Sequence, residues 1–127
     1  MTPSVPSVLA ELAQLLVRNA DPATPDAERA GALTLSSMLL VVAAEVWDGA
    51  AENLVQENRA LAALLPDTAA EGDLRLSVLR AENERLRALL IAAQIAAENG
   101  GDTARQDAIW AELLASTERR KLSISLV

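Results

Sequence analysis

Three carboxylates near the middle of the chain are the first residues that could do chemistry. Asp48 and Glu52 follow Glu45 at spacings of three and seven residues, so a helix would carry all three on one face. Carboxylates in this pattern could bind Mg²⁺ or Ca²⁺, or serve as a general acid and base. Helical two-metal sites combine glutamates with histidine, and the sequence has no histidine and no second carboxylate pair suited to face this one. We therefore interpret the three residues as a solvated or salt-bridged face.

A cationic cluster is the second group with chemical potential. Arg119, Arg120 and Lys121 follow one another near the C-terminal end of an expected helix, where positive charge suits the helix dipole. The alternative interpretation is contact with a small anion or a phosphate-bearing partner. The sequence contains no glycine-rich phosphate loop, no nucleophile motif and no dinucleotide-binding fingerprint that would support it.

The composition removes several classes of chemistry. The chain has no cysteine, which excludes disulfides, thiolate metal sites and cysteine nucleophiles. It also lacks histidine and tyrosine, and so lacks the commonest general base and a phenolic acid. A formal net charge of −7 makes a nucleic-acid backbone an unfavourable partner. We expect a non-enzymatic protein with no catalytic residue, no metal, no cofactor and no nucleic-acid partner.

The apolar residues predict an all-α protein. They make up 51% of the 127 residues, and many are alanine and leucine, the strongest helix formers among them. Alanine-rich helices bury little area per residue, which leaves apolar surface to be covered and favours a homodimer. Trp47 and Trp110 are the only aromatic residues. We predict that both fill the core, with an interface contact as the alternative, for Trp47 in a dimer.

Prolines and glycines divide the chain into its elements. Breaks are expected at the two prolines of residues 21–25, at residues 66–72 and at the Asn-Gly-Gly of residues 99–101. The predicted fold is an up-and-down bundle over residues 1–127, in which the second and third helices form a long antiparallel hairpin. The two shorter helices pack at its open end. The four helices are expected at about residues 7–19, 25–65, 73–98 and 104–120.

The two ends of the chain and its most apolar segment bear on where in the cell the protein is located. The first residues carry no basic region before an apolar core, so we predict no secretory signal. The longest uncharged run, Ala30 to Ala44, has 15 residues, and as a helix it would span about 22 Å, short of a bilayer core of about 30 Å. We predict a buried helix, no membrane contact and a cytoplasmic protein. Residues 122–127 alternate apolar and polar side chains, so a strand, an extended clasp and a helical extension all stay open.

One phrase occurs twice in the sequence. Residues 57–65 return 25 positions later as residues 82–90, and both copies begin with Glu-Asn. Around each copy, apolar residues recur at spacings of three and four, as along the seam of a coiled coil. A buried asparagine in such a seam lowers stability but selects one register, because only one arrangement satisfies its amide. The two seams are Leu54, Asn58, Leu61 and Leu65, and Leu76, Leu79, Asn83, Leu86 and Leu90.

An antiparallel hairpin centred near residue 69 makes specific predictions about these seams. Glu57 would face Arg80 and Glu52 would face Arg85, which joins opposite charges at flanking positions. Asn58 and Asn83 lie slightly out of opposition in this arrangement. They could bind each other within the hairpin, each could meet a symmetry mate in a dimer, or they could hold a ligand.

The C-terminal segment resembles a known group of proteins. Leu114, Thr117, Lys121 and Leu122 fall at the spacings of the closing helix of a small uncharacterised bacterial helical family. Its members tend to be encoded beside acyl-CoA dehydrogenases and aminoglycoside-phosphotransferase-like proteins. The resemblance extends over about the last two-thirds of the chain, but Ser123-Ile124-Ser125 stands where the family has Asn-Pro. It implies an accessory role and a protein partner from acyl-CoA metabolism.

Three functions are compatible with these observations. The first is a non-enzymatic helical interaction or accessory protein that associates with itself. The second is a protein that binds a small apolar or acyl-CoA-related ligand between the alanine-lined segment 38–46 and the cations of residues 119–121. The third, and least supported, is an all-carboxylate metal-dependent hydrolase.

Overall fold

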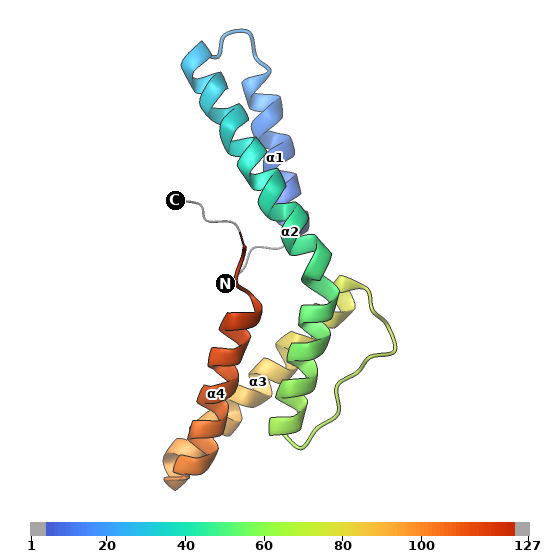
Figure 1. Ribbon diagram of the computed structural model, residues 1–127, viewed down its shortest axis with the longest axis vertical. Coiled ribbons are helices and arrows are strands. Elements are labelled where there is room, and N and C mark those ends of the chain that lie inside the picture. The colour runs from blue at the N-terminus through green and yellow to red at the C-terminus, as the bar shows by residue number, and fades with distance from the viewer. Residues whose placement is uncertain (1–4, 124–127) are drawn as a thin grey trace. The chain divides into compact units, whose positions relative to one another are not determined.

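A computed structural model describes residues 5–123 of the chain, apart from the side chain of Pro6, and this part is all-α. Its elements are four helices, and the described residues contain no strand (Figure 1). The predicted fold class is confirmed. Predicted helix ends differ from those observed by at most three residues, and the conformation predicted for residues 124–127 lies outside the described residues. The helices are α1 (Val5–Asn19), α2 (Asp26–Leu64), α3 (Leu76–Gly100) and α4 (Thr103–Arg119).

Local signals account for the helix ends. Asp26 and Glu28 lie in the first turn of α2, where negative charge suits the helix dipole. Gly101 follows α3 in the left-handed conformation with φ of 65°, and the backbone N–H of Asp102 donates to Ala97 at 2.9 Å, which satisfies carbonyl groups at the helix end. The Asp102 side chain then accepts a hydrogen bond from the Arg105 backbone N–H and caps α4.

The helices form two compact units, which we describe separately. The first contains α1 and the residues of α2 up to Asp48, together with Leu122 and Ser123. The second runs from Gly49 to Lys121 and contains the rest of α2, α3 and α4. The prediction of a single domain over residues 1–127 stays a prediction.

The first unit has a small core. Among residues 5–48, the buried positions are Val5, Leu12, Ser36 and Ala43. The prediction that Ala30–Ala44 is a buried helix is therefore wrong: it is a helix, but most of its residues are exposed. Among the described helices α2 is the one long and apolar enough to cross a membrane, by length and composition only, and 11% of its most apolar window is buried.

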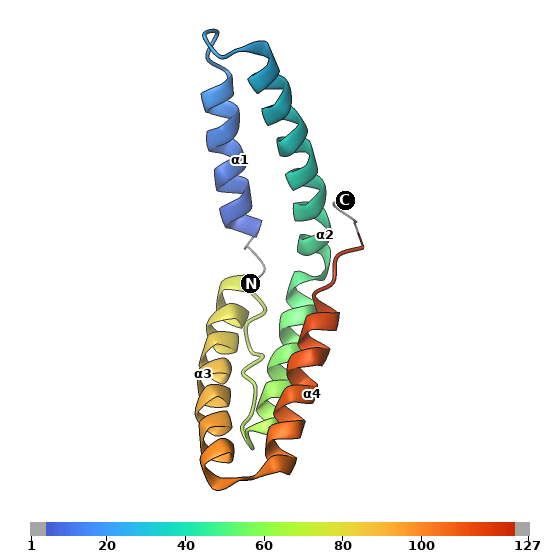
Figure 2. The same cartoon turned by 90° about the vertical axis from the view of Figure 1, so that its left-hand side faces the viewer.

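The second unit pairs α2 and α3 in the same direction. Asn58 of α2 contacts Leu79 and Asn83 of α3, and Leu61 packs in one core cluster with Leu86 and Leu90. Residue numbers on the two helices therefore rise together. Residues 65–75 return alongside the helices, and α4 then runs in the opposite direction (Figure 2). The predicted antiparallel hairpin is wrong, because the connection is a long return segment and not a tight turn.

The core of the second unit lies between its three helices. Leu61, Ala62, Leu86, Leu90 and Ile109 are buried together, and the leucines among them belong to the two predicted seams. The prediction that both tryptophans fill the core is wrong. Trp47 and Trp110 are 55% and 59% exposed.

Candidate functional site

A buried carboxylate is the centre of the second unit. Glu57 of α2 is 3% exposed and lies among polar side chains of both other helices. From α3, Asn83 Nδ2 donates to Glu57 Oε1 at 3.1 Å and Arg87 Nη2 donates to the same oxygen at 2.5 Å. From α4, Ser116 Oγ donates to Oε2 at 3.0 Å, and Arg120 Nη2 reaches both oxygens at 2.7 Å. These residues, together with Asn58, form what we call the Glu57 cluster.

The two asparagines of the repeated phrase bind each other. Asn83 Nδ2 donates to Asn58 Oδ1 at 2.8 Å, and Asn58 Nδ2 donates to the Leu79 carbonyl oxygen at 3.1 Å. Arg87 Nε donates to Asn83 Oδ1 at 3.0 Å. Of the three alternatives left open by the sequence, the intrachain pair is the one observed. Sliding α3 by one turn would place an amide against leucine, so the pair selects the register of the two helices.

The electrostatics of Glu57 balance burial against two cations. Burial raises the pKa of this carboxyl, but hydrogen bonds from Arg120, Arg87 and Asn83 outweigh it and lower the pKa from 4.5 to about 2. Glu57 is therefore ionised at neutral pH and satisfied on both oxygens. A group in this state holds three helices together, and it is poorly suited to accept or donate a proton near neutral pH.

The depressed pKa predicts a dependence of stability on pH. Because the folded pKa lies below the unfolded value, the contribution of Glu57 is complete above pH 4.5 and is lost as pH falls toward 2. A difference of this size corresponds to about 3 kcal/mol. Between pH 6 and pH 3 the linkage removes about 2 kcal/mol of this contribution, so urea denaturation should show a loss of that size in the wild type and a smaller loss in Glu57→Gln. An equal loss in both proteins would contradict the assignment to Glu57.

The predicted ion pairs are not those found. Glu57 pairs with Arg87 and Arg120, not Arg80, and Arg85 pairs with Asp67 and Glu82, not Glu52. Both predictions assumed antiparallel helices, and the parallel arrangement places other residues opposite each other. Two other arginines hold the return segment, residues 65–75. Arg85 joins Asp67 of that segment to Glu82 of α3, and Arg59 binds Glu71.

Removing one of these segment contacts should have a small effect. Arg85 is 45% exposed in its side chain, so water competes for its ion pairs. We expect Arg85→Gln to lower the free energy of unfolding only slightly, and far less than Glu57→Gln does. Guanidinium or urea denaturation at pH 7 would measure it, and a loss as large as that of a Glu57 variant would show that the return segment is part of the core.

The cationic cluster is divided among carboxylates. Arg120 binds Glu57, Lys121 lies 2.7 Å from Glu118, and Arg119 pairs with Glu112. All three positive charges therefore have an intrachain partner. The predicted contact of residues 119–121 with an anion loses its support, because an anion would have to displace these carboxylates.

Glu45, Asp48 and Glu52 of α2, the carboxylates considered as a possible metal site, do not converge on one point. Glu45 Oε1 accepts a hydrogen bond from the Ser123 backbone N–H, and Glu52 Oε1 accepts one from Gln56. Asp48 is exposed. Within residues 5–123 no group of three or more acidic, histidine or cysteine side chains could hold a metal ion.

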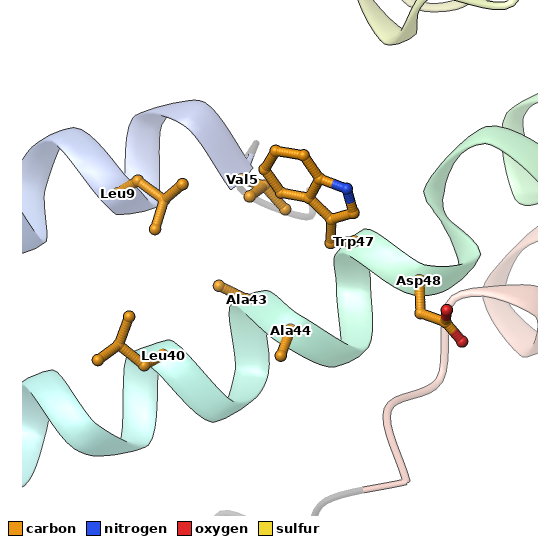
Figure 3. Close-up of a pocket in the computed structure, with 7 residues that line it drawn as sticks. All are labelled: Val5, Leu9, Leu40, Ala43, Ala44, Trp47 and Asp48. Atoms are coloured by element: carbon orange, nitrogen blue, oxygen red, sulfur yellow. The ribbon is translucent and has the colours of Figure 1, made fainter.

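Large apolar side chains are exposed on the first unit. Eight large apolar side chains of α1 and α2 are each between 40% and 55% exposed, and two of them, Leu35 and Met38, lie on another side of α2. Some of them border an open hollow of about 420 Å³ between the helices, where the ring of Trp47 lies beside Val5 and Asp48 points away from α1 (Figure 3). We call the other six side chains the α1–α2 face: Leu9, Leu16, Leu33, Leu40, Val41 and Trp47.

Leu33, Leu40 and Trp47 of the α1–α2 face belong to a heptad seam along α2. Exposed residues recur at spacings of three and four along α2, and the series continues through Ala51 into the seam of Leu54, Asn58 and Leu61. In that second part α3 buries Asn58 and Leu61. The first part has the same pattern but no covering helix among the described residues. We call this first part the uncovered seam, and its positions are Ala30, Leu33, Ser37, Leu40, Ala44 and Trp47.

Comparison with known proteins identifies no relative of this chain. The chain matches no protein-family model, no curated protein and no solved structure. The resemblance of residues 114–122 to the bacterial helical family therefore stays a prediction.

Proposed function

We propose that this protein is a helical interaction protein that associates with itself through the α1–α2 face. The observation that carries the proposal is the uncovered half of the α2 seam. A heptad pattern on an exposed helix face is typical of a surface that another helix covers. The role is non-enzymatic and cytoplasmic, and an accessory function beside acyl-CoA metabolism remains the proposed setting.

The size of the face supports a second copy as its occupant. A leucine-sized side chain offers about 100 Å² of apolar surface when exposed and a tryptophan about 200 Å². The six half-exposed side chains therefore present roughly 350 Å². A standard interface buries about 800 Å² per partner, of which somewhat more than half is apolar. The face is therefore close to the apolar part of one ordinary protein interface.

The small core of the first unit gives an independent reason for a partner. Four buried positions are few for two helices, and a helical segment of this size gains most of its stability from packing an apolar face. A partner on the α1–α2 face would complete that core.

The charge of the unit favours protein over membrane as the covering surface. Helices that lie on membranes usually carry Lys and Arg on their polar side. Residues 5–48 contain two arginines against six carboxylates, which an anionic lipid surface would repel: Glu11, Asp21, Asp26, Glu28, Glu45 and Asp48.

A small apolar ligand is the second candidate, and the hollow is the observation that favours it. Its lining is apolar except for Asp48, and it is open to solvent. An acyl group would find apolar contacts there, but Asp48 offers a negative charge where an acyl carboxylate or phosphate would need a positive one.

Native mass spectrometry of the purified full chain tests the proposal. We expect a species of twice the 13.4 kDa chain mass with no added mass. A monomer that retains an acyl-sized ligand would replace the proposal by the second candidate. Flotation with anionic and zwitterionic vesicles tests whether a lipid surface covers the face instead. A monomer that floats with either kind of vesicle would overturn self-association in favour of lipid binding.

A further inference from the structure

The order of large and small residues along the uncovered seam bears on how two copies would pack. The large residues Leu33, Leu40 and Trp47 recur every seven positions. The small residues Ala30, Ser37 and Ala44 also recur every seven positions, between them. All of these positions are exposed in α2. One edge of the uncovered seam is thus bulky and the other edge is small.

A parallel pair of such helices would pack unevenly. In a parallel seam each position meets its own copy. Ala30, Ser37 and Ala44 would then face small residues and leave gaps, whereas two Trp47 side chains would meet in a single layer. Gaps and overfilled layers both cost stability, because protein interiors are close-packed.

An antiparallel pair of the same helices packs evenly. When the two seams run in opposite directions, each layer takes one residue from each edge of the seam. One alignment places Ala30 opposite Trp47, Leu33 opposite Ala44, and Ser37 opposite Leu40. Every layer then combines one large and one small side chain, which is how well-packed cores fill space at facing positions. In this alignment all six positions of the uncovered seam on each copy lie in the interface.

We infer that a second copy of the chain packs its α2 antiparallel on this seam, with Leu33 of one copy opposite Ala44 of the other. The inference rests on the proposed self-association and adds its direction and register. The interface is isologous, because the same patch on each copy meets its equivalent around a two-fold axis between Ser37 and Leu40. In this arrangement the hollow beside Leu40 and Trp47 receives side chains of the partner.

Cysteine cross-linking tests direction and register, because the native chain contains no cysteine that could interfere. A disulfide requires Cα atoms within about 7 Å. The full-length double variant Leu33→Cys/Ala44→Cys should form a covalent dimer under mild oxidation with copper phenanthroline. Within one chain the two cysteines lie about 16 Å apart along the helix, so every disulfide must join two copies.

The single variant Ala44→Cys is the matched control. In the antiparallel register its cysteine lies about 16 Å along the axis from its equivalent, and we expect less than a tenth of the cross-linking. Equal cross-linking of Ala44→Cys and the double variant would overturn the antiparallel direction while leaving self-association intact. A dimeric mass with no cross-link in the double variant would overturn the register. A monomeric mass for the wild type would overturn the proposed function, and with it this inference.

Discussion

Glu57→Gln should lower the free energy of unfolding at pH 7 by about 3 kcal/mol, the largest effect expected of any single surface or cluster charge. The substitution keeps the size of the side chain but removes the charge that Arg87 and Arg120 share. Two guanidinium groups would then lie together without a counter-ion. Their side chains are 38% and 33% exposed, so water recovers part of the loss, which places the effect at the low end for a broken buried ion pair.

Glu52→Gln is the matched control for this variant. Glu52 lies on the same helix five positions earlier, is exposed, and accepts a hydrogen bond from the Gln56 side chain. We expect its stability to change by less than about 0.5 kcal/mol. Urea denaturation followed by circular dichroism would measure both variants. Equal, small effects at the two sites would show that the Glu57 cluster does not hold the three helices together.

Leu40→Glu should raise the dissociation constant of the proposed dimer by about a thousandfold. Leu40 lies at the middle of the uncovered seam and borders the hollow beside Trp47. The two-fold symmetry of the dimer would place two new charges at its centre, and each buried hot spot lost costs at least about 2 kcal/mol. Two such losses correspond to about a thousandfold in affinity. Light scattering over a dilution series would measure the change.

Leu35→Glu controls for the charge and for the loss of a leucine. Leu35 is 48% exposed against 51% for Leu40, but it lies outside the heptad seam and on a different side of α2. We expect the dimer dissociation constant of Leu35→Glu to stay within about threefold of the wild-type value. Unchanged helical circular dichroism in both variants would confirm that the monomers remain folded. An equal loss of association at Leu35 and Leu40 would contradict the choice of face.

The repeated phrase predicted the seams of α2 and α3 well. Asn58 and Asn83 were expected at equivalent seam positions, and the structure joins them directly at 2.8 Å. Such local periodicity is readable from sequence because buried positions of a helix recur every three or four residues. The role inferred for the asparagines, selection of register, follows from the observed hydrogen bonds.

The direction of α3 was predicted wrongly, although the sequence contained a signal for it. Two copies of one phrase place like against like only when their helices run parallel, since a positions meet a positions in a parallel seam. Asn58 and Asn83 meet in this way, 25 residues apart. The assumption of a short turn near residue 69 concealed the signal, because residues 65–75 return along the helices before α3 begins.

The partners of Glu57 could be predicted only in part. Arg87 follows Asn83 by four residues and Arg120 follows Ser116 by four, so each helix presents a polar residue and an arginine on one face. That pattern marks two polar faces, but it does not say which carboxylate they share. Arg120 lies 63 residues from Glu57, and its contact depends on how α4 packs on the other two helices. The predicted burial of Ala30–Ala44 failed for a similar reason, because apolar composition alone does not say whether the covering surface comes from the same chain.

Sedimentation equilibrium of the wild-type chain tests the central claim most directly, namely that a second copy covers the uncovered seam of α2. The mass should rise with concentration from the 13.4 kDa of one chain to twice that value, and in Leu40→Glu it should stay at one chain over the same range. A wild type that remains monomeric at hundreds of micromolar, a range in which ordinary specific dimers associate, would contradict the account.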